Sequence, residues 1–129
     1  MTQEPQGFFK KIGDFFMKGV VVEELEAEMF PTDSPGARKI GELEFTRFKP
    51  GNTRFEIEIK RRADIPAGDE VAVLIHGVEV CRVTIHPMKT EVNLFSDRGD
   101  QVPTIKPGDE ASLVHNGQVI ATGVFRIDD

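Results

Sequence analysis

The strongest constraint on this fold is an internal repeat. One copy opens with Ile65-Pro66-Ala67-Gly68-Asp69-Glu70 and reaches a turn at His76-Gly77, and the other opens with Ile105-Lys106-Pro107-Gly108-Asp109-Glu110 and reaches Asn116-Gly117. The copies lie about forty residues apart and have the same internal spacing. Each predicts a Pro/Gly turn, a strand, a two-residue hairpin turn and a return strand. We therefore expect repeated hairpins over 65–86, with strands 70–75 and 78–85, and over 105–127, with strands 110–114 and 118–127.

Alternating residues predict further strands outside the repeats. The segments 24–29, 40–48 and 53–60 alternate apolar with charged or polar residues, which is the period of a strand with one buried face. Glu, Leu and Ala also favour helices, so a helix is the alternative over 24–29, but the preceding valine run favours a strand. A short strand is expected over 90–95. The chain thus predicts about eight strands, a pattern typical of an antiparallel sandwich or a small barrel.

Of these two, we expect an all-β antiparallel β-sandwich, formed by residues 20–129 as a single domain. Residues 1–19 are expected to form a polar arm and an amphipathic helix over 7–18. A helix of that length is marginal alone, and Gly13 weakens it further, so it needs a partner surface. Its apolar face consists of Phe8, Phe9, Ile12, Phe15 and Phe16, and its other side carries Lys10, Lys11 and Lys18.

The Phe-rich helix has three interpretations. It packs on an open face of its own sandwich, it docks on a neighbouring chain, or it lies in a membrane interface. In the third case Lys10, Lys11 and Lys18 would contact anionic headgroups.

Composition limits the partners. The 129 residues carry a formal net charge of -6, which argues against nucleic-acid binding because phosphates need a concentrated basic face. No secretory signal and no long apolar run is visible, so we expect a cytoplasmic protein that the helix can associate with a membrane. The single cysteine, Cys81, excludes an intrachain disulfide and is interpreted as a strand residue.

The residues that invite a chemical interpretation are better explained as turns. His76, His86 and His115 lack the short spacing of metal ligands, although similarly oriented repeats would bring His76 and His115 to one end of the molecule. The acidic pairs 69–70 and 109–110 are typical of turns before strands, and the Arg98-Gly99-Asp100 tripeptide matches an integrin-binding motif by chance. We therefore predict no catalytic residue, no metal site, no cofactor and no small-molecule substrate.

From Leu25 onward the chain resembles small hairpin-repeat all-β modules of uncharacterised bacterial proteins. The resemblance implies an antiparallel sandwich built from hairpins, and it implies no catalytic residues. The matching segments are 41–45, 53–58, 66–68, 76–77, 116–119 and 123–125.

The sequence thus predicts a non-catalytic structural or protein-interaction module. We expect it to form a homo-oligomer or to dock on a protein partner through helix 7–18. The alternative is a peripheral membrane protein that is anchored by the same helix.

Overall fold

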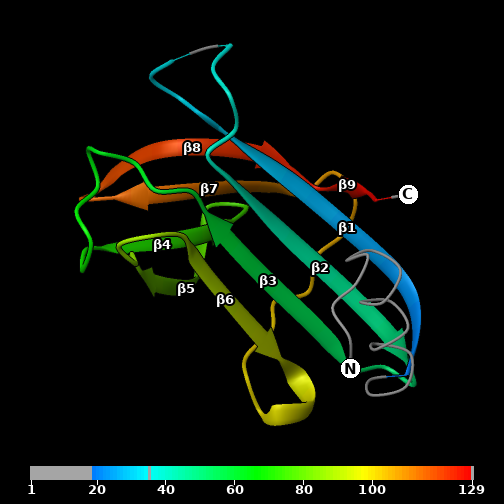
Figure 1. Cartoon of the computed structure of the whole chain (residues 1–129). Helices are drawn as coiled ribbons and strands as arrows, with labels where there is room; N and C mark the ends of the chain where they lie inside the picture. Colours follow the sequence, from blue (N-terminus) through cyan, green and yellow to red (C-terminus); the bar gives the residue numbers. More distant parts are fainter. Residues whose placement is uncertain (1–18, 35, 129) are drawn as a thin grey trace.

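The structure is a computed structural model that describes residues 19–34 and 36–128. Within these residues the regular elements are strands, apart from one short 3-10 helix at Ser96–Arg98 (Figure 1). The strands are β1 Val20–Pro31, β2 Gly41–Lys49, β3 Thr53–Ile59, β4 Glu70–Ile75, β5 Val78–Thr84, β6 Thr90–Phe95, β7 Glu110–His115, β8 Gln118–Val124 and β9 Arg126–Ile127.

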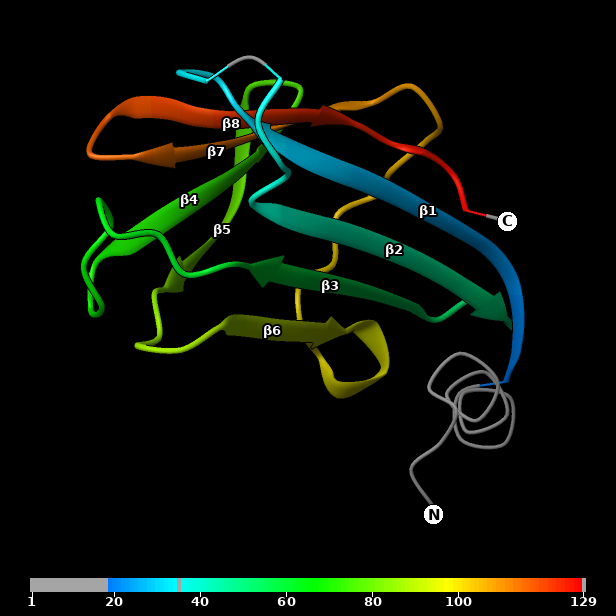
Figure 2. The ribbon, with the colours of Figure 1, turned by 45° about the horizontal axis from the view of Figure 1, so that its top comes forward.

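The strands form one antiparallel sheet in the order β5-β4-β7-β8-β1-β2-β3-β6, with β9 paired to β1. The 12-residue strand β1 joins the two halves, because it pairs with β2 along most of its length and with β8 at Phe30 and Pro31. The sheet curls until its edge strands β5 and β6 come into contact, so it is nearly closed into a barrel (Figure 2). The predicted all-β antiparallel fold is confirmed. Instead of the two separate sheets of the predicted sandwich, the strands form one nearly closed sheet, because β1 pairs with both halves.

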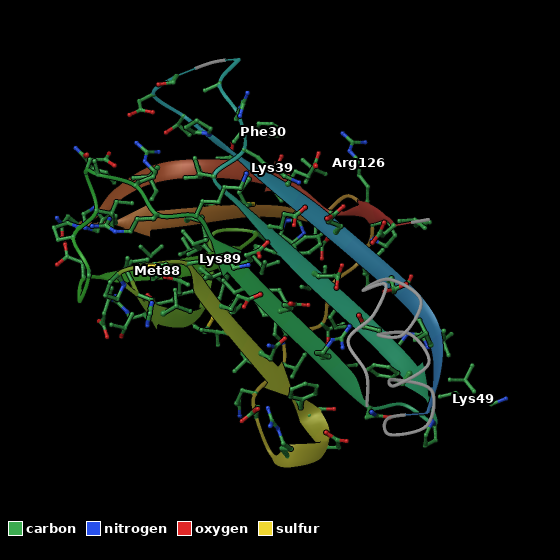
Figure 3. All side chains as sticks on the ribbon, in the orientation of Figure 1. Phe30, Lys39, Lys49, Met88, Lys89 and Arg126 are labelled. Atoms are coloured by element: carbon green, nitrogen blue, oxygen red, sulfur yellow. The ribbon has the colours of Figure 1, made fainter. Side chains whose placement is uncertain are left out.

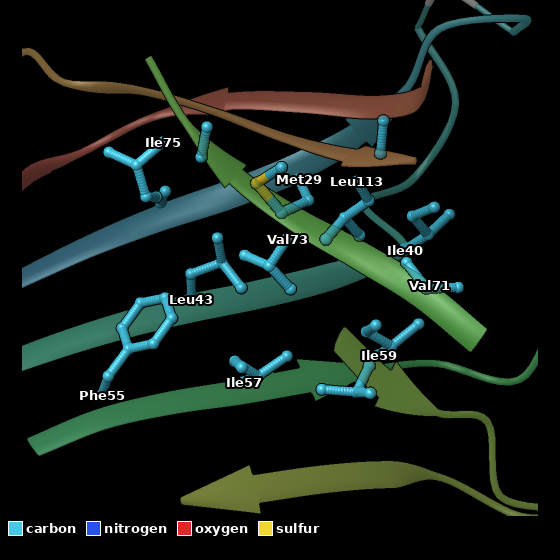
Figure 4. Packing of buried hydrophobic residues seen from close by; sticks show 14 of the residues in the cluster. Met29, Ile40, Leu43, Phe55, Ile57, Ile59, Val71, Val73, Ile75 and Leu113 are labelled. Atoms are coloured by element: carbon cyan, nitrogen blue, oxygen red, sulfur yellow. The ribbon is translucent and has the colours of Figure 1, made fainter. Parts of the chain in front are cut away.

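The apolar positions of the alternating strands fill the interior. Leu25, Ala27 and Met29 of β1 have no exposed surface, and the glutamates between them face outward. Side chains from β1 to β4 and from β7 meet in one cluster (Figure 4). Burial of each large apolar side chain contributes about 1.5–3 kcal/mol relative to an exposed position. The alternation in the sequence therefore determines which face of each strand points inward.

A local two-fold axis relates the hairpins β4–β5 and β7–β8. Val73 pairs with Leu113, and these residues occupy equivalent positions in the two copies. Antiparallel strands that pair at equivalent residues are related by a two-fold axis between those residues. Both hairpins also have a register shift at the same position. In the turns, His76 and Asn116 have φ of 52° and 50°, the left-handed conformation that a type I′ turn requires.

The last predicted strand is wrong in part. The segment 118–127 does not continue as one return strand, because β8 ends at Val124 and β9 pairs with β1 instead of β7. The buried ring of Phe125 separates them, and its N–H donates to the Asp109 carbonyl at 2.9 Å.

The predicted helix 7–18 lies outside the described residues. Among the residues that the structure describes, there is no helix with the length and apolar character needed to cross a membrane.

Candidate interaction surface

Glutamate side chains cover the outer face of β1, β2 and β3. Because the alternate residues fill the core, the glutamates of all three strands share one face. The register places Glu42 beside Glu28 of β1 and beside Glu58 of β3. Like charges directly opposite one another on a sheet are destabilising. The acidic face consists of Glu26, Glu28, Glu42, Glu44, Glu56 and Glu58.

Two lysines neutralise part of the acidic face. Lys39 Nζ lies 3.0 Å from Glu28 Oε2 and 2.5 Å from Glu42 Oε2. Lys89 Nζ lies 2.8 Å from Glu58 Oε2. Hydrogen bonds to Glu42 and Glu28 raise the pKa of Lys39. These lysines offset part of the repulsion that the register imposes on the glutamates.

Burial and the neighbouring carboxylates together change the pKa of Glu26. Burial, followed by the hydrogen bond and charge of Glu42, raises the pKa of Glu26 to about 7. The hydrogen bond from Lys39 lowers the pKa of Glu42. Glu26 is therefore protonated below neutral pH while Glu42 remains ionised.

Two triplets of carboxylates have oxygen atoms within 4.8 Å of one another among the described residues. Calcium takes about six to eight oxygen ligands, whereas each triplet offers three side chains, and Lys39 already pairs with two carboxylates of one triplet. We therefore treat these carboxylates as part of the charged surface and assign no metal to them. The triplets are Glu26, Glu28 and Glu42, and Glu24, Glu44 and Asp128.

An aspartate of each repeat contacts a histidine of the other repeat. His76 Nε2 lies 2.7 Å from Asp109 Oδ1, and His115 Nε2 lies 2.9 Å from Asp69 Oδ2. Antiparallel pairing places the end of β4 beside the start of β7, so the two pairs lie at opposite ends of the β4–β7 pair. The two repeats therefore lack the similar orientation that would have brought His76 and His115 to one end of the molecule. These turn residues link the two repeats.

The two aspartates differ in their other bonds. The Lys106 N–H donates to Asp109 Oδ2 at 2.9 Å. The equivalent residue in the first copy is Pro66, which has no N–H to donate to Asp69. The bond from the Lys106 backbone, followed by the bond to His76, lowers the pKa of Asp109.

Three hollows lie end to end on the outside of β1, β9 and β8. Their volumes are about 350, 370 and 420 Å³. The first and second share Ile127 and Asp128, and the second and third share Gly123 and Val124. Exposed apolar side chains line all three, and we call them the apolar track. The apolar track consists of Val22, Phe30, Val119, Val124 and Ile127, which are 37–63% exposed.

The apolar track has an acidic rim. Arg47 and Arg126 are the basic residues that line these hollows. Figure 3 shows Phe30 and Arg126 on the side of the molecule away from Met88. The acidic residues of the rim are Glu23, Glu24, Glu26, Glu28, Glu110 and Asp128.

The residues predicted to mediate contacts fall in a segment that the structure does not describe. The apolar residues Phe8, Phe9, Ile12, Phe15 and Phe16, and the basic residues Lys10, Lys11 and Lys18, all precede Gly19. Sequence reasoning missed the apolar track, although Val119 and Val124 occupy positions where the first copy has Glu79 and Thr84.

The remaining candidates take part in local structure. Burial, followed by the charge of Glu79, raises the pKa of the Cys81 thiol to about 11. His86 Nδ1 accepts a hydrogen bond from the Met88 N–H at 3.1 Å. The carboxylate of Asp100 accepts the Phe95 N–H at 2.8 Å and so stabilises its own turn.

No protein-family model matches this chain, and no curated protein matches it. The resemblance to small hairpin-repeat modules therefore stays a prediction that rests on the sequence.

Proposed function

We propose that this protein is a non-catalytic structural or interaction module that assembles through its Phe-rich segment 7–18. The observation that carries the proposal is that the barrel interior is already filled. The rings of Phe55 and Phe125 have no exposed surface, and both belong to the apolar cluster that fills the interior. The apolar residues of segment 7–18 therefore need a surface outside that core.

The chemistry of the described surface supports a non-catalytic role. With its pKa raised to about 11, the Cys81 thiol is protonated near neutral pH, whereas a nucleophile needs the thiolate. His76 and His115 each face an aspartate that links the two repeats. The two histidines thus have structural partners that account for their positions.

A second candidate function is attachment to a membrane surface through the same segment. Lys10, Lys11 and Lys18 accompany its phenylalanines, a composition that suits an anionic interface. The acidic face opposes this candidate, because it repels anionic headgroups.

The molar mass of the full chain tests the proposal. We expect light scattering, with refractive-index detection because Trp and Tyr are absent, to give a defined oligomer. The double variant Phe15→Ser/Phe16→Ser should be a folded monomer. The control Met88→Ser removes a side chain that is 74% exposed and should keep the wild-type mass.

The same variants separate the two candidate functions. A monomeric full chain that binds anionic vesicles through segment 7–18 would replace assembly by membrane attachment. A monomer that does not bind vesicles would contradict both candidate functions.

A further inference from the structure

We propose that the apolar track of one chain binds segment 7–18 of a second copy. This inference rests on the proposed function, because it names the partner of the same segment. The proposed contact between two copies is reciprocal, because each chain contributes one segment and one track.

The first argument is the continuity of the track. Five of the eight large apolar side chains exposed on the described surface line its three hollows, and Val20 directly precedes the first of them. Exposed apolar residues that gather in one strip mark an interaction surface more strongly than scattered ones. The apolar face predicted for segment 7–18 would cover such a strip.

The second argument is charge. Six acidic side chains and two arginines line the three hollows. Segment 7–18 carries three lysines and one aspartate in a chain whose net charge is -6. A basic apolar segment therefore complements an apolar track with an acidic rim. Its lysines would meet carboxylates while its phenyl rings cover Phe30 and Ile127.

The third argument is geometry, and it favours a second copy. The chain reaches β1 at Gly19, where an added Cβ would lie 2.2 Å from the Lys49 carbonyl oxygen. This places the start of β1 against the end of β2, whereas β8 and β9 pair on the opposite side of β1.

The lengths lead to the same choice. From Val20 to Phe30 an extended strand covers about 33 Å, whereas a twelve-residue helix covers about 18 Å. As the predicted helix, a chain's own segment 7–18, which ends just before Gly19, could reach the first hollow beside Val22 but not the hollow around Val119. The segment of a second copy has no such restriction.

The experiment uses two complementary variants of the full chain. The segment variant is Phe15→Ser/Phe16→Ser, which keeps an intact track, and the track variant is Phe30→Ser/Ile127→Ser, which keeps an intact segment. We expect each variant alone to be monomeric, with self-association weakened about tenfold or more, since buried aromatic anchors dominate interfaces. An equimolar mixture should form a complex of two chains, because one intact segment meets one intact track.

Controls separate loss of contact from loss of fold. Phe30 and Ile127 are 46% and 63% exposed, so both substitutions should leave the circular dichroism spectrum unchanged. If the track variant fails to fold, Val119→Ser/Ile127→Ser replaces it in the mixture. The control Met88→Ser, on a different part of the surface, should keep the wild-type mass.

The failures of the two proposals are distinguishable. If the folded track variants keep the wild-type oligomer while the segment variant dissociates, the segment assembles through another surface and the track inference is wrong. The track inference is also wrong if the mixture of two monomeric variants stays monomeric. If the segment variant keeps the wild-type oligomer, or the wild-type chain is itself monomeric, the proposed function fails together with the inference.

Discussion

The two repeated hairpins have the same backbone plan but different outer surfaces. In β5, at the edge of the sheet, Arg82 Nε lies 2.8 Å from Glu79 Oε2. The equivalent residues in β8 are Val119 and Thr122, and β8 lies inside the sheet beside β1. Charged residues on an edge strand oppose pairing with other chains. The comparison teaches that position in the sheet, and not the repeat itself, determines what each copy exposes.

The same comparison shows where the copies must stay alike. Val73 and Leu113 face each other at the two-fold axis, and both are fully buried. The turns keep glycine at Gly77 and Gly117, each with a positive φ. Core and turn residues thus maintain the shared backbone, while the outward positions differ between the copies.

The largest expected effect tests the shared core. Leu113→Ala should lower the free energy of unfolding by about 3 kcal/mol and Val73→Ala by about 2 kcal/mol, because both leave a cavity at the two-fold axis. Chemical denaturation followed by far-ultraviolet circular dichroism measures both values. A near-zero effect of either substitution would show that the two copies do not share one core.

The second prediction concerns a residue that differs between the copies. Gly123 occupies the position of Val83, and a Cβ at Gly123 would lie 2.4 Å from the Glu28 carbonyl oxygen. Gly123→Ala should therefore cost about 2 kcal/mol, since backbone must move to accept the methyl group. Gly108→Ala is the control, because it adds a methyl group in open space at a φ of +92°. It should cost about 1 kcal/mol through backbone strain alone.

The third prediction compares the two aspartates that link the repeats. Asp109→Asn should cost about 1.5 kcal/mol near neutral pH and Asp69→Asn about 0.5 kcal/mol, because Asp109 also accepts the Lys106 N–H. Because the pKa of Asp109 is lower in the folded state than its ordinary value of 3.8, Asp109 stabilises the fold above pH 3.8. This stabilisation is lost as the pH falls through the pKa of the folded state.

The pH dependence provides the check on this comparison. The difference in unfolding free energy between the wild type and Asp109→Asn should shrink below about pH 4. Equal costs for Asp69→Asn and Asp109→Asn near neutral pH would contradict the role of the Lys106 N–H.

The smallest expected effect lies on the other half of the sheet. The pKa of Glu26 is raised from 4.5 to about 7. Its contribution to the stability of the fold is therefore fully present below pH 4.5 and is lost as the pH rises through 7. Glu26→Gln should therefore stabilise the fold by about 0.5–1 kcal/mol near pH 8, because it removes a charge opposite other glutamates.

Thermal melts across pH measure this effect. The stability of Glu26→Gln should vary less than that of the wild type between about pH 5 and 7. The control is Glu79→Gln, since Glu79 on β5 pairs with Arg82 and lies opposite the apolar Leu74, and it should bring no gain near pH 8. A loss of stability in Glu26→Gln near pH 8 would show that the acidic face does not strain the sheet.

The strands were predictable because each depends on local residues. The bounds of β4 and β6 agree with the expected 70–75 and 90–95, since apolar alternation and flanking turns define them. The near closure of the barrel depends on the pairing of β1 with both β2 and β8, and no local pattern reports such a pairing. The division of 118–127 into two strands depends on the same strand, because β9 pairs with β1.

The apolar track was harder to predict for a similar reason. Phe30 ends β1, Val119 and Val124 lie in β8, and Ile127 lies in β9, so the sheet brings together residues that are distant in sequence. Individually, exposed apolar residues carry no signal. Comparing the copies at Val119 and Val124 would have indicated an outward face that the first copy keeps polar.

The most direct test of the assembly is a cross-link between two different chains. In a Cys81→Ala background, a chain with Phe16→Cys is mixed with a chain with Ile127→Cys. The mixture is oxidised, and the cross-linked peptides are identified by mass spectrometry. The account predicts a disulfide between the two chains, and none when Met88→Cys replaces Ile127→Cys. Equal cross-linking to both positions, or none to Ile127→Cys, would contradict the docking of segment 7–18 on the apolar track.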